Sequence, residues 1–200
     1  MAASAACGVR SVEVPVDAGP APSRASCTPP AAEDGTEVYL VCGSRVEPVA
    51  RSIELPGMQS SAAGSGQEEP EDTPRAEREG ARDRVALAAA LLSELQSDPE
   101  HEEQAAGFTS TVPADLRVSG PAGDDPDRLL RLSSRPDDLP AFALVQIICT
   151  FAHTQPVGDG HSVLLAGPAE TAADQDARGY TCGATLRNRP DTARTAAESP

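Results

Sequence analysis

The segment from Asp138 to Gly167 constrains the fold most, because it gathers large apolar side chains that are scarce elsewhere in the chain. It reads Asp-Leu-Pro-Ala-Phe-Ala-Leu-Val-Gln-Ile-Ile-Cys-Thr-Phe-Ala-His up to His153, followed by a turn with proline and glycine and then by an apolar run over 161–166. This order predicts a helix, a turn and a buried strand that pack as one unit. Any hydrophobic core must form around that unit.

The chain as a whole can supply only one small domain. Its 200 residues include three phenylalanines, two tyrosines and no tryptophan, and much of the apolar 39% is alanine, which buries little surface. The chain has no lysine, which excludes Schiff-base chemistry and a P-loop lysine. A formal charge of −15 repels nucleic acid and anionic lipid, so we expect no nucleic-acid partner.

The five cysteines are odd in number and show no C-x-x-C spacing; they are Cys7, Cys27, Cys42, Cys149 and Cys182. Either they are reduced thiols of a cytoplasmic protein, or one is modified and four are free to pair. No apolar run approaches the roughly 20 residues that span a bilayer.

Two β-rich runs, 36–42 and 49–55, predict a hairpin joined through Gly43 to Arg45, with Pro48 at the start of the second strand. A helix is predicted over 81–97, where Asp98-Pro99 ends it. Its apolar stripe consists of Val85, Ala88, Leu91, Leu92 and Leu95.

The second half predicts a strand near Leu116 and Val118, and 128–132 fits a strand or two helical turns equally well. The helix over 139–153 has Asp138 as its expected cap and Pro140 in its first turn. Its polar stripe of Gln146, Thr150 and His153 is expected on the exposed side. The expected structural core consists of Val85, Leu92, Leu95, Phe142, Val145 and Cys149.

Three stretches are too poor in large apolar side chains to fold by themselves. We expect a flexible tether over 8–35, a mobile acidic loop over 56–80 and a disordered polar tail over 168–200.

Candidate chemical sites are weak. Cys149, His153, His161 and Cys182 could form a zinc tetrahedron, but their spacing crosses the expected tail, so a buried Cys149 and a surface His153 are the better interpretation. A nucleophilic Cys149/His153 pair is disfavoured because apolar surroundings raise the pKa of a thiol and lower its reactivity. The acidic run 124–127 lacks the glycine and the distal glutamate of a calcium loop, and Gly158-Asp-Gly160 is a turn. We therefore expect no metal, no cofactor and no catalytic residues.

Several pieces of the chain occur in a particular order: Glu37-Val-Tyr-Leu-Val41, Val49-Ala-Arg51, Ala88-Ala-Ala-Leu-Leu92, Gly107-Phe-Thr-Ser-Thr-Val-Pro113, Ala143-Leu-Val-Gln-Ile-Ile-Cys-Thr150 and Val163 to Gly167. Together they resemble the GerM-type (GerMN) domain of bacterial envelope and sporulation proteins, over residues 36–167. The helix with Gln146 and Thr150 and the joint from Gly107 to Pro113 are the more specific pieces. The long 56–80 insertion and the weak strand over 128–132 depart from the pattern.

The resemblance implies an α+β domain in which two helices pack on one face of a small sheet, in the order strand, strand, helix, strand, strand, helix, strand. It makes 128–132 a strand. The family occurs in exported and often lipid-anchored proteins and has no established catalytic residues. The resemblance therefore implies a non-enzymatic binding or assembly module.

Residues 1–7 resemble the end of a lipoprotein signal, in which small residues precede a cysteine that becomes diacylated, here Cys7. Ser4 departs from the branched aliphatic residue usual there, and the charged and apolar regions are missing. The expectation is a lipid anchor on the outer face of the cytoplasmic membrane and an envelope-protein or cell-wall partner. The alternative is a soluble, acidic regulatory protein of the cytoplasm that binds a protein through short ordered segments.

Overall fold

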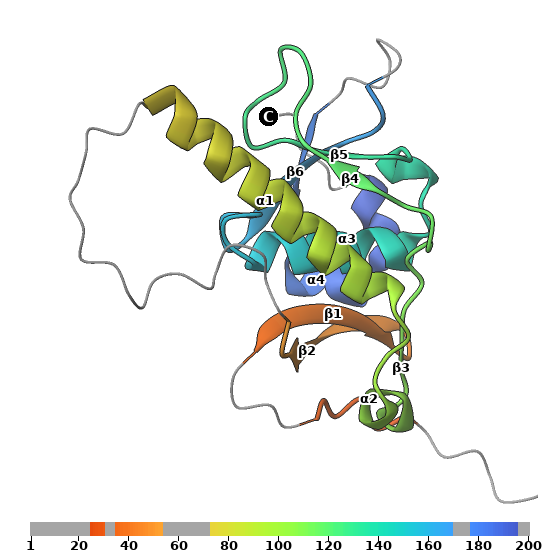
Figure 1. Ribbon diagram of the computed structural model, residues 1–200. Helices are drawn as coiled ribbons and strands as arrows, with labels where there is room; N and C mark the ends of the chain where they lie inside the picture. Colours follow the sequence, from red (N-terminus) through yellow and green to blue (C-terminus); the bar gives the residue numbers. More distant parts are fainter. Residues whose placement is uncertain (1–24, 31–34, 54–72, 170–176, 196–200) are drawn as a thin grey trace, which may run out of the picture.

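Helix α3 (Ala141–His153) is the centre of this computed structural model, which describes residues 25–30, 35–53, 73–169 and 177–195. Every residue from Ala143 to Ala152 is buried. Strands of two different sheets, helix α1 and the C-terminal segment all pack around it (Figure 1). A helix covered on all sides needs an apolar sequence, which this segment supplies. The mixed α+β class predicted from the sequence is confirmed.

The first sheet has the strand order β2-β1-β3. β1 (Thr36–Cys42) and β2 (Arg45–Arg51) form the predicted antiparallel hairpin, and β3 (Phe108–Thr109) pairs with the end of β1. The tight turn uses Gly43 at φ 63°, a conformation that favours glycine. The second strand begins at Arg45, earlier in the sequence than the predicted 49–55, because it continues through Pro48 instead of starting after it.

Pro48 lies in the middle of β2, opposite Tyr39, and not at a strand start as predicted. Proline cannot donate to a strand ladder, so it is tolerated on an edge strand. β2 is such an edge. The N–H and C=O of Tyr39 bond to side chains of α3 instead of to Pro48, so no ladder bond is lost at this pair.

The second sheet was not expected, since the sequence predicted only one. Its order is β4-β5-β6-β7, formed by β4 (Val118–Ser119), β5 (Leu130–Leu132), β6 (Ser162–Ala166) and β7 (Arg178–Thr181). β5 and β6 are parallel, and α3 lies in the connection between them. In the ambiguous 128–132 segment, the strand is therefore limited to Leu130–Leu132, and Arg128 lies in the turn before it.

Helix α1 (Thr73–Gln96) begins well before the predicted Ala81, and its apolar face is buried at Leu87, Ala88, Leu91, Leu92 and Leu95. A short helix, α2 (His101–Ala106), was not predicted. Asp138 does not cap α3: it lies in the 3-10 turn η1 (Pro136–Asp138), and Pro140 occupies the N-cap position.

The predicted disordered tail is wrong for 177–195. After β7 come α4 (Ala184–Asn188) and the 3-10 turn η3 (Pro190–Arg194). The stretch is polar on average, yet Tyr180, Cys182, Leu186 and Ala193 are buried. Strand pairing with β6 and a disulfide between Cys149 and Cys182 hold it to the core.

The predicted tether is wrong for residues 25–30, because Cys27 forms a disulfide with Cys42 at the end of β1. The N–H of Cys27 also donates to the carbonyl of Ala106, at 3.1 Å. A Cβ on Gly107 would lie 2.4 Å from the Cβ of Ala25, so glycine is required for this close approach. The other parts of the predicted tether, loop and tail at 1–24, 31–34, 54–72, 170–176 and 196–200 lie outside the described residues. Residues 73–80 of the predicted acidic loop are helical.

The residues expected in the core lie in or against it. Leu92, Leu95, Val145 and Cys149 are buried, and Val85 and Phe142 are partly buried against the same cluster.

Candidate functional site

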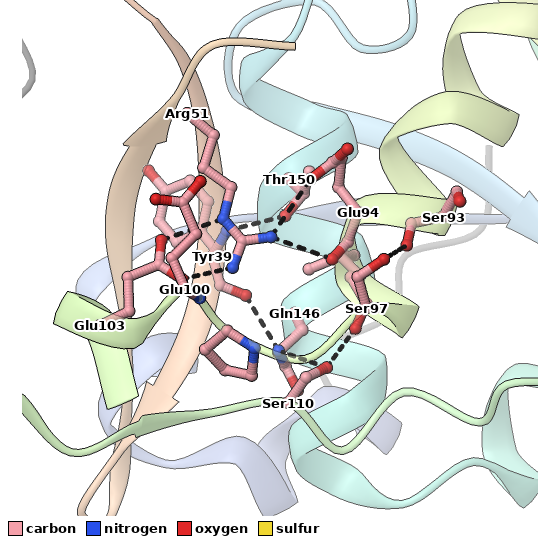
Figure 2. Close-up of polar contacts among 12 residues, drawn as sticks. Tyr39, Arg51, Ser93, Glu94, Ser97, Glu100, Glu103, Ser110, Gln146 and Thr150 are labelled. Carbon is pink, nitrogen blue, oxygen red and sulfur yellow. Dashed lines mark hydrogen bonds and ion pairs between the residues drawn. The ribbon is translucent and has the colours of Figure 1, made fainter. Parts of the chain in front are cut away.

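Gln146 and Thr150 form a polar seam between α3 and β1. The N–H of Tyr39 donates to Oγ1 of Thr150 at 3.0 Å, and Nε2 of Gln146 donates to the carbonyl of Tyr39 at 3.1 Å (Figure 2). Residues four apart share one helix face, so both side chains reach the same strand. The expectation that they lie on the exposed side is wrong: both are fully buried.

The seam exists because β3 is too short to cover β1. β3 pairs only with Val41 and Cys42, which leaves the β3-side edge of β1 open at Tyr39. Buried N–H and C=O groups need partners, and here side chains replace a missing strand. Oε1 of Gln146 also accepts from the N–H and the hydroxyl of Thr111, each at 3.0 Å. Gln146 thus joins β1 to the chain that follows β3.

A second part of the site is a buried cluster around Arg51, at the end of β2. Nε and Nη2 of Arg51 donate to the two carboxylate oxygens of Glu103 on α2, at 3.0 and 2.5 Å. Nη1 donates to the carbonyl of Glu94 on α1 at 3.1 Å and to its carboxylate at 3.3 Å (Figure 2). Bidentate pairing of this kind orients both partners. The cluster therefore fixes α1, α2 and β2 relative to one another.

Burial alone lowers the pKa of Arg51, but the hydrogen bonds and charge of Glu103, and then those of Glu94, outweigh burial and raise it. Glu103 also caps the start of α2, since its Oε2 accepts from the N–H of Glu100 at 2.8 Å. Neither α2 nor the role of Glu103 was predicted from the sequence. A readable signal was present: Glu103 stands three residues after Glu100, which is the spacing of a helix-capping box.

Tyr39 and His153 stack at one end of the seam, with ring centroids 5.1 Å apart. The hydroxyl of Tyr39 donates to the carboxylate of Glu37 at 3.4 Å. Burial, followed by the charge of Glu37, raises the pKa of Tyr39 to about 12. The phenol therefore stays protonated at neutral pH and cannot serve as a base.

The zinc arrangement weighed from the sequence does not form. Cys149 and Cys182 are joined in a disulfide, which removes both thiolate ligands and also the nucleophile of a Cys149/His153 pair. His161 is exposed, and Nδ1 of His153 lies 2.9 Å from the carbonyl of Cys149. Among the described residues, no group of three or more His, Cys, Asp or Glu side chains could hold a metal ion.

The acidic run 124–127 contributes to a second buried ion pair. Nε and Nη2 of Arg131 donate to the two carboxylate oxygens of Asp125, each at 2.6 Å, and Nη1 donates to the carbonyl of Gly167 at 2.8 Å. The hydrogen bonds from Arg131 lower the pKa of Asp125, with help from the N–H of Ala122 and against the effect of burial. Asp125 therefore has a structural role.

Comparisons with family models, with curated proteins and with solved structures find no match to this chain. Across the described ranges, no helix combines the length and the apolar character needed to cross a bilayer. The polar seam and the Arg51 cluster both bind parts of the protein to each other.

Proposed function

We propose that this protein is a non-catalytic binding or assembly module of a bacterial cell envelope, exported and held to the outer face of the cytoplasmic membrane by lipid on Cys7. Its domain would be of the GerM type. The pairing of four cysteines carries this proposal: Cys27 with Cys42 and Cys149 with Cys182. Disulfides persist in oxidising compartments and are rare in the cytoplasm.

The disulfides also bear on the role of Cys7. With the other four cysteines bonded, Cys7 is the single cysteine left for modification. Cys7 itself lies outside the described residues. A diacylated cysteine would anchor the protein firmly, because each buried CH₂ contributes about 0.8 kcal/mol.

The meeting of two sequence motifs supports the GerM-type assignment. The helix with Gln146 and Thr150 and the joint from Gly107 to Pro113 are the most specific pieces of the resemblance. In the fold they touch, since Oε1 of Gln146 accepts from the N–H of Thr111. A fold in common with that family would require both motifs, because they contact each other.

The test is to fractionate cells of the native host that express the gene from its own locus. Wild type is expected in the membrane pellet with an N-terminal mass shifted by a diacylglyceryl group, and Cys7→Ser in the soluble fraction. Cys27→Ser is the matched control, because it removes a cysteine, and with it the disulfide to Cys42, without removing the lipid site, and it should stay in the pellet. A soluble wild-type protein with all five thiols reduced would instead support the cytoplasmic regulatory protein.

A further inference from the structure

Arg84 and Arg128 form an arginine pair in a chain whose formal charge is −15. Arg84 lies on α1, and its Nη2 donates to the carbonyl of Asp127. Arg128 precedes β5, and its Nη2 donates to the carbonyl of Gly158 at 3.1 Å. Three segments far apart in sequence therefore meet at this pair: α1, the chain before β5 and the turn after α3.

The chain between β4 and β5 packs directly on α1 beside the arginine pair. A Cβ on Gly120 would lie 3.2 Å from Cγ2 of Val85, the residue next to Arg84. Burial lowers the pKa of Arg84, and the positive charge of Arg128 lowers it further, against the attraction of Asp127. Arg84 also donates to the carbonyl of the residue that directly precedes Arg128, which brings the two arginines together in the fold.

The arginine pair is incompletely compensated. Nε of Arg84 is buried and has no hydrogen-bond acceptor among the described residues. Within the same part of the chain, the carboxylate of Asp127 forms no hydrogen bond or ion pair with either guanidinium. Asp159 forms its hydrogen bonds within its own turn, where Oδ1 accepts the N–H groups of His161 and Ser162 and Oδ2 accepts the Ser162 hydroxyl. These bonds lower the pKa of Asp159, and the charge of Arg128 adds a smaller contribution, so Asp159 offsets part of the charge of Arg128 but none of the unpaired Nε of Arg84. A buried charged donor without an acceptor is costly.

We propose that the arginine pair binds an oxyanion, the carboxylate or phosphate group of a ligand. Guanidinium groups match the geometry of both anions, and the anion would offset the repulsion between the two cations. Arg128 is exposed and Arg84 is half-buried, so the pair is in contact with solvent although Nε of Arg84 itself is covered. The negative charge of the whole protein opposes every anion, which predicts affinity of only about millimolar Kd for a small free ion.

The test follows the Nε–Hε signals of arginine by NMR on the full chain. Sodium phosphate and sodium acetate are each titrated against sodium chloride at constant ionic strength. The Arg84 signal is expected to move saturably with phosphate, acetate or both, and the responding ion identifies the ligand class. Arg128→Gln should weaken binding by about tenfold or more, because it removes one charge-assisted contact.

Arg82→Gln is the matched control, because Arg82 is exposed on the same helix and its replacement makes the same change in net charge. It should leave the titration unchanged, and backbone spectra check that both variants are folded. A signal that responds to neither anion beyond chloride overturns the proposal. So does equal affinity in wild type and Arg128→Gln. The proposal stands or falls independently of the lipid anchor.

Discussion

Arg51 and Glu103 face each other through two parallel hydrogen bonds in an ion pair whose side chains are 4% and 3% exposed. Replacing Glu103 with glutamine leaves the guanidinium buried with only Glu94 to compensate it. We expect Glu103→Gln to lower the free energy of unfolding by about 3 to 5 kcal/mol, measured by urea denaturation. Glu94→Gln is the control: its side chain is 35% exposed, so we expect a loss of about 1 kcal/mol or less. Equal losses in the two variants would show that the bidentate pair with Glu103 stabilises the fold no more than the contact with Glu94.

Thr150→Val removes the hydroxyl that accepts the N–H of Tyr39 while keeping the side-chain shape. We expect a loss of about 1 to 3 kcal/mol, because a buried backbone donor is left without an acceptor. Amide hydrogen exchange should become faster at Tyr39. Thr150→Ser keeps the hydroxyl and should preserve slow exchange at that amide; if Thr150→Val preserves it as well, the seam does not protect β1.

Leu92→Glu places a charge on the buried face of α1, where Leu92 is 3% exposed. The variant should lose about 3 kcal/mol or more of unfolding free energy, which combines the lost side-chain burial with the cost of a buried charge. Thermal melting provides the measurement. Ala89→Glu makes a similar change on the exposed face of the same helix and should melt close to wild type. An unchanged melting curve for Leu92→Glu would make that face a recognition surface.

Asp125→Asn tests the pH dependence of the second ion pair. The hydrogen bonds from Arg131 hold the pKa of Asp125 below its usual range, so the folded state binds a proton less readily than the unfolded state. The stabilisation is therefore fully present above the ordinary aspartate pKa of about 3.9 and is lost as pH falls through the lower folded pKa. The difference in unfolding free energy between wild type and Asp125→Asn should shrink as pH falls from 5 towards 2, in urea titrations.

Asp124→Asn is the matched control for that series. Asp124 is exposed beside Asp125, and it makes no hydrogen bond or ion pair to any residue that the structure describes. Its unfolding curve should follow wild type at every pH. A constant gap between wild type and Asp125→Asn would show that the Asp125 carboxylate does not titrate with the fold.

The apolar periodicity located the elements whose burial depends on side chains. The stripe with Leu92 and Leu95 and the run around Val145 gave both long helices, because a 3.6-residue repeat of large apolar groups leaves few other packings. The hairpin of β1 and β2 followed from β-branched residues around a glycine turn. These features are local, so a single sequence is enough to predict them.

Features that depend on distant partners were missed. The polar stripe with Gln146 and Thr150 reads as a solvent-facing surface until β1 supplies a backbone edge more than 100 residues away. The segment around Tyr180 looks like a polar tail because its order comes from pairing with β6 and from the bond between Cys182 and Cys149. Contacts of this range leave no periodic trace in either segment.

The disulfide between Cys27 and Cys42 also determines how tension enters the domain. A pull on the chain ahead of Cys27 passes through the covalent sulfur bridge to the end of β1, and the stretch between the two cysteines carries little of it. The hydrogen bonds between β1 and β2 therefore do not carry this force, and the hairpin is not opened from Thr36. Under the N-terminal anchor proposed above, this bridge would let the domain resist a pull from a bound partner without unfolding its first sheet.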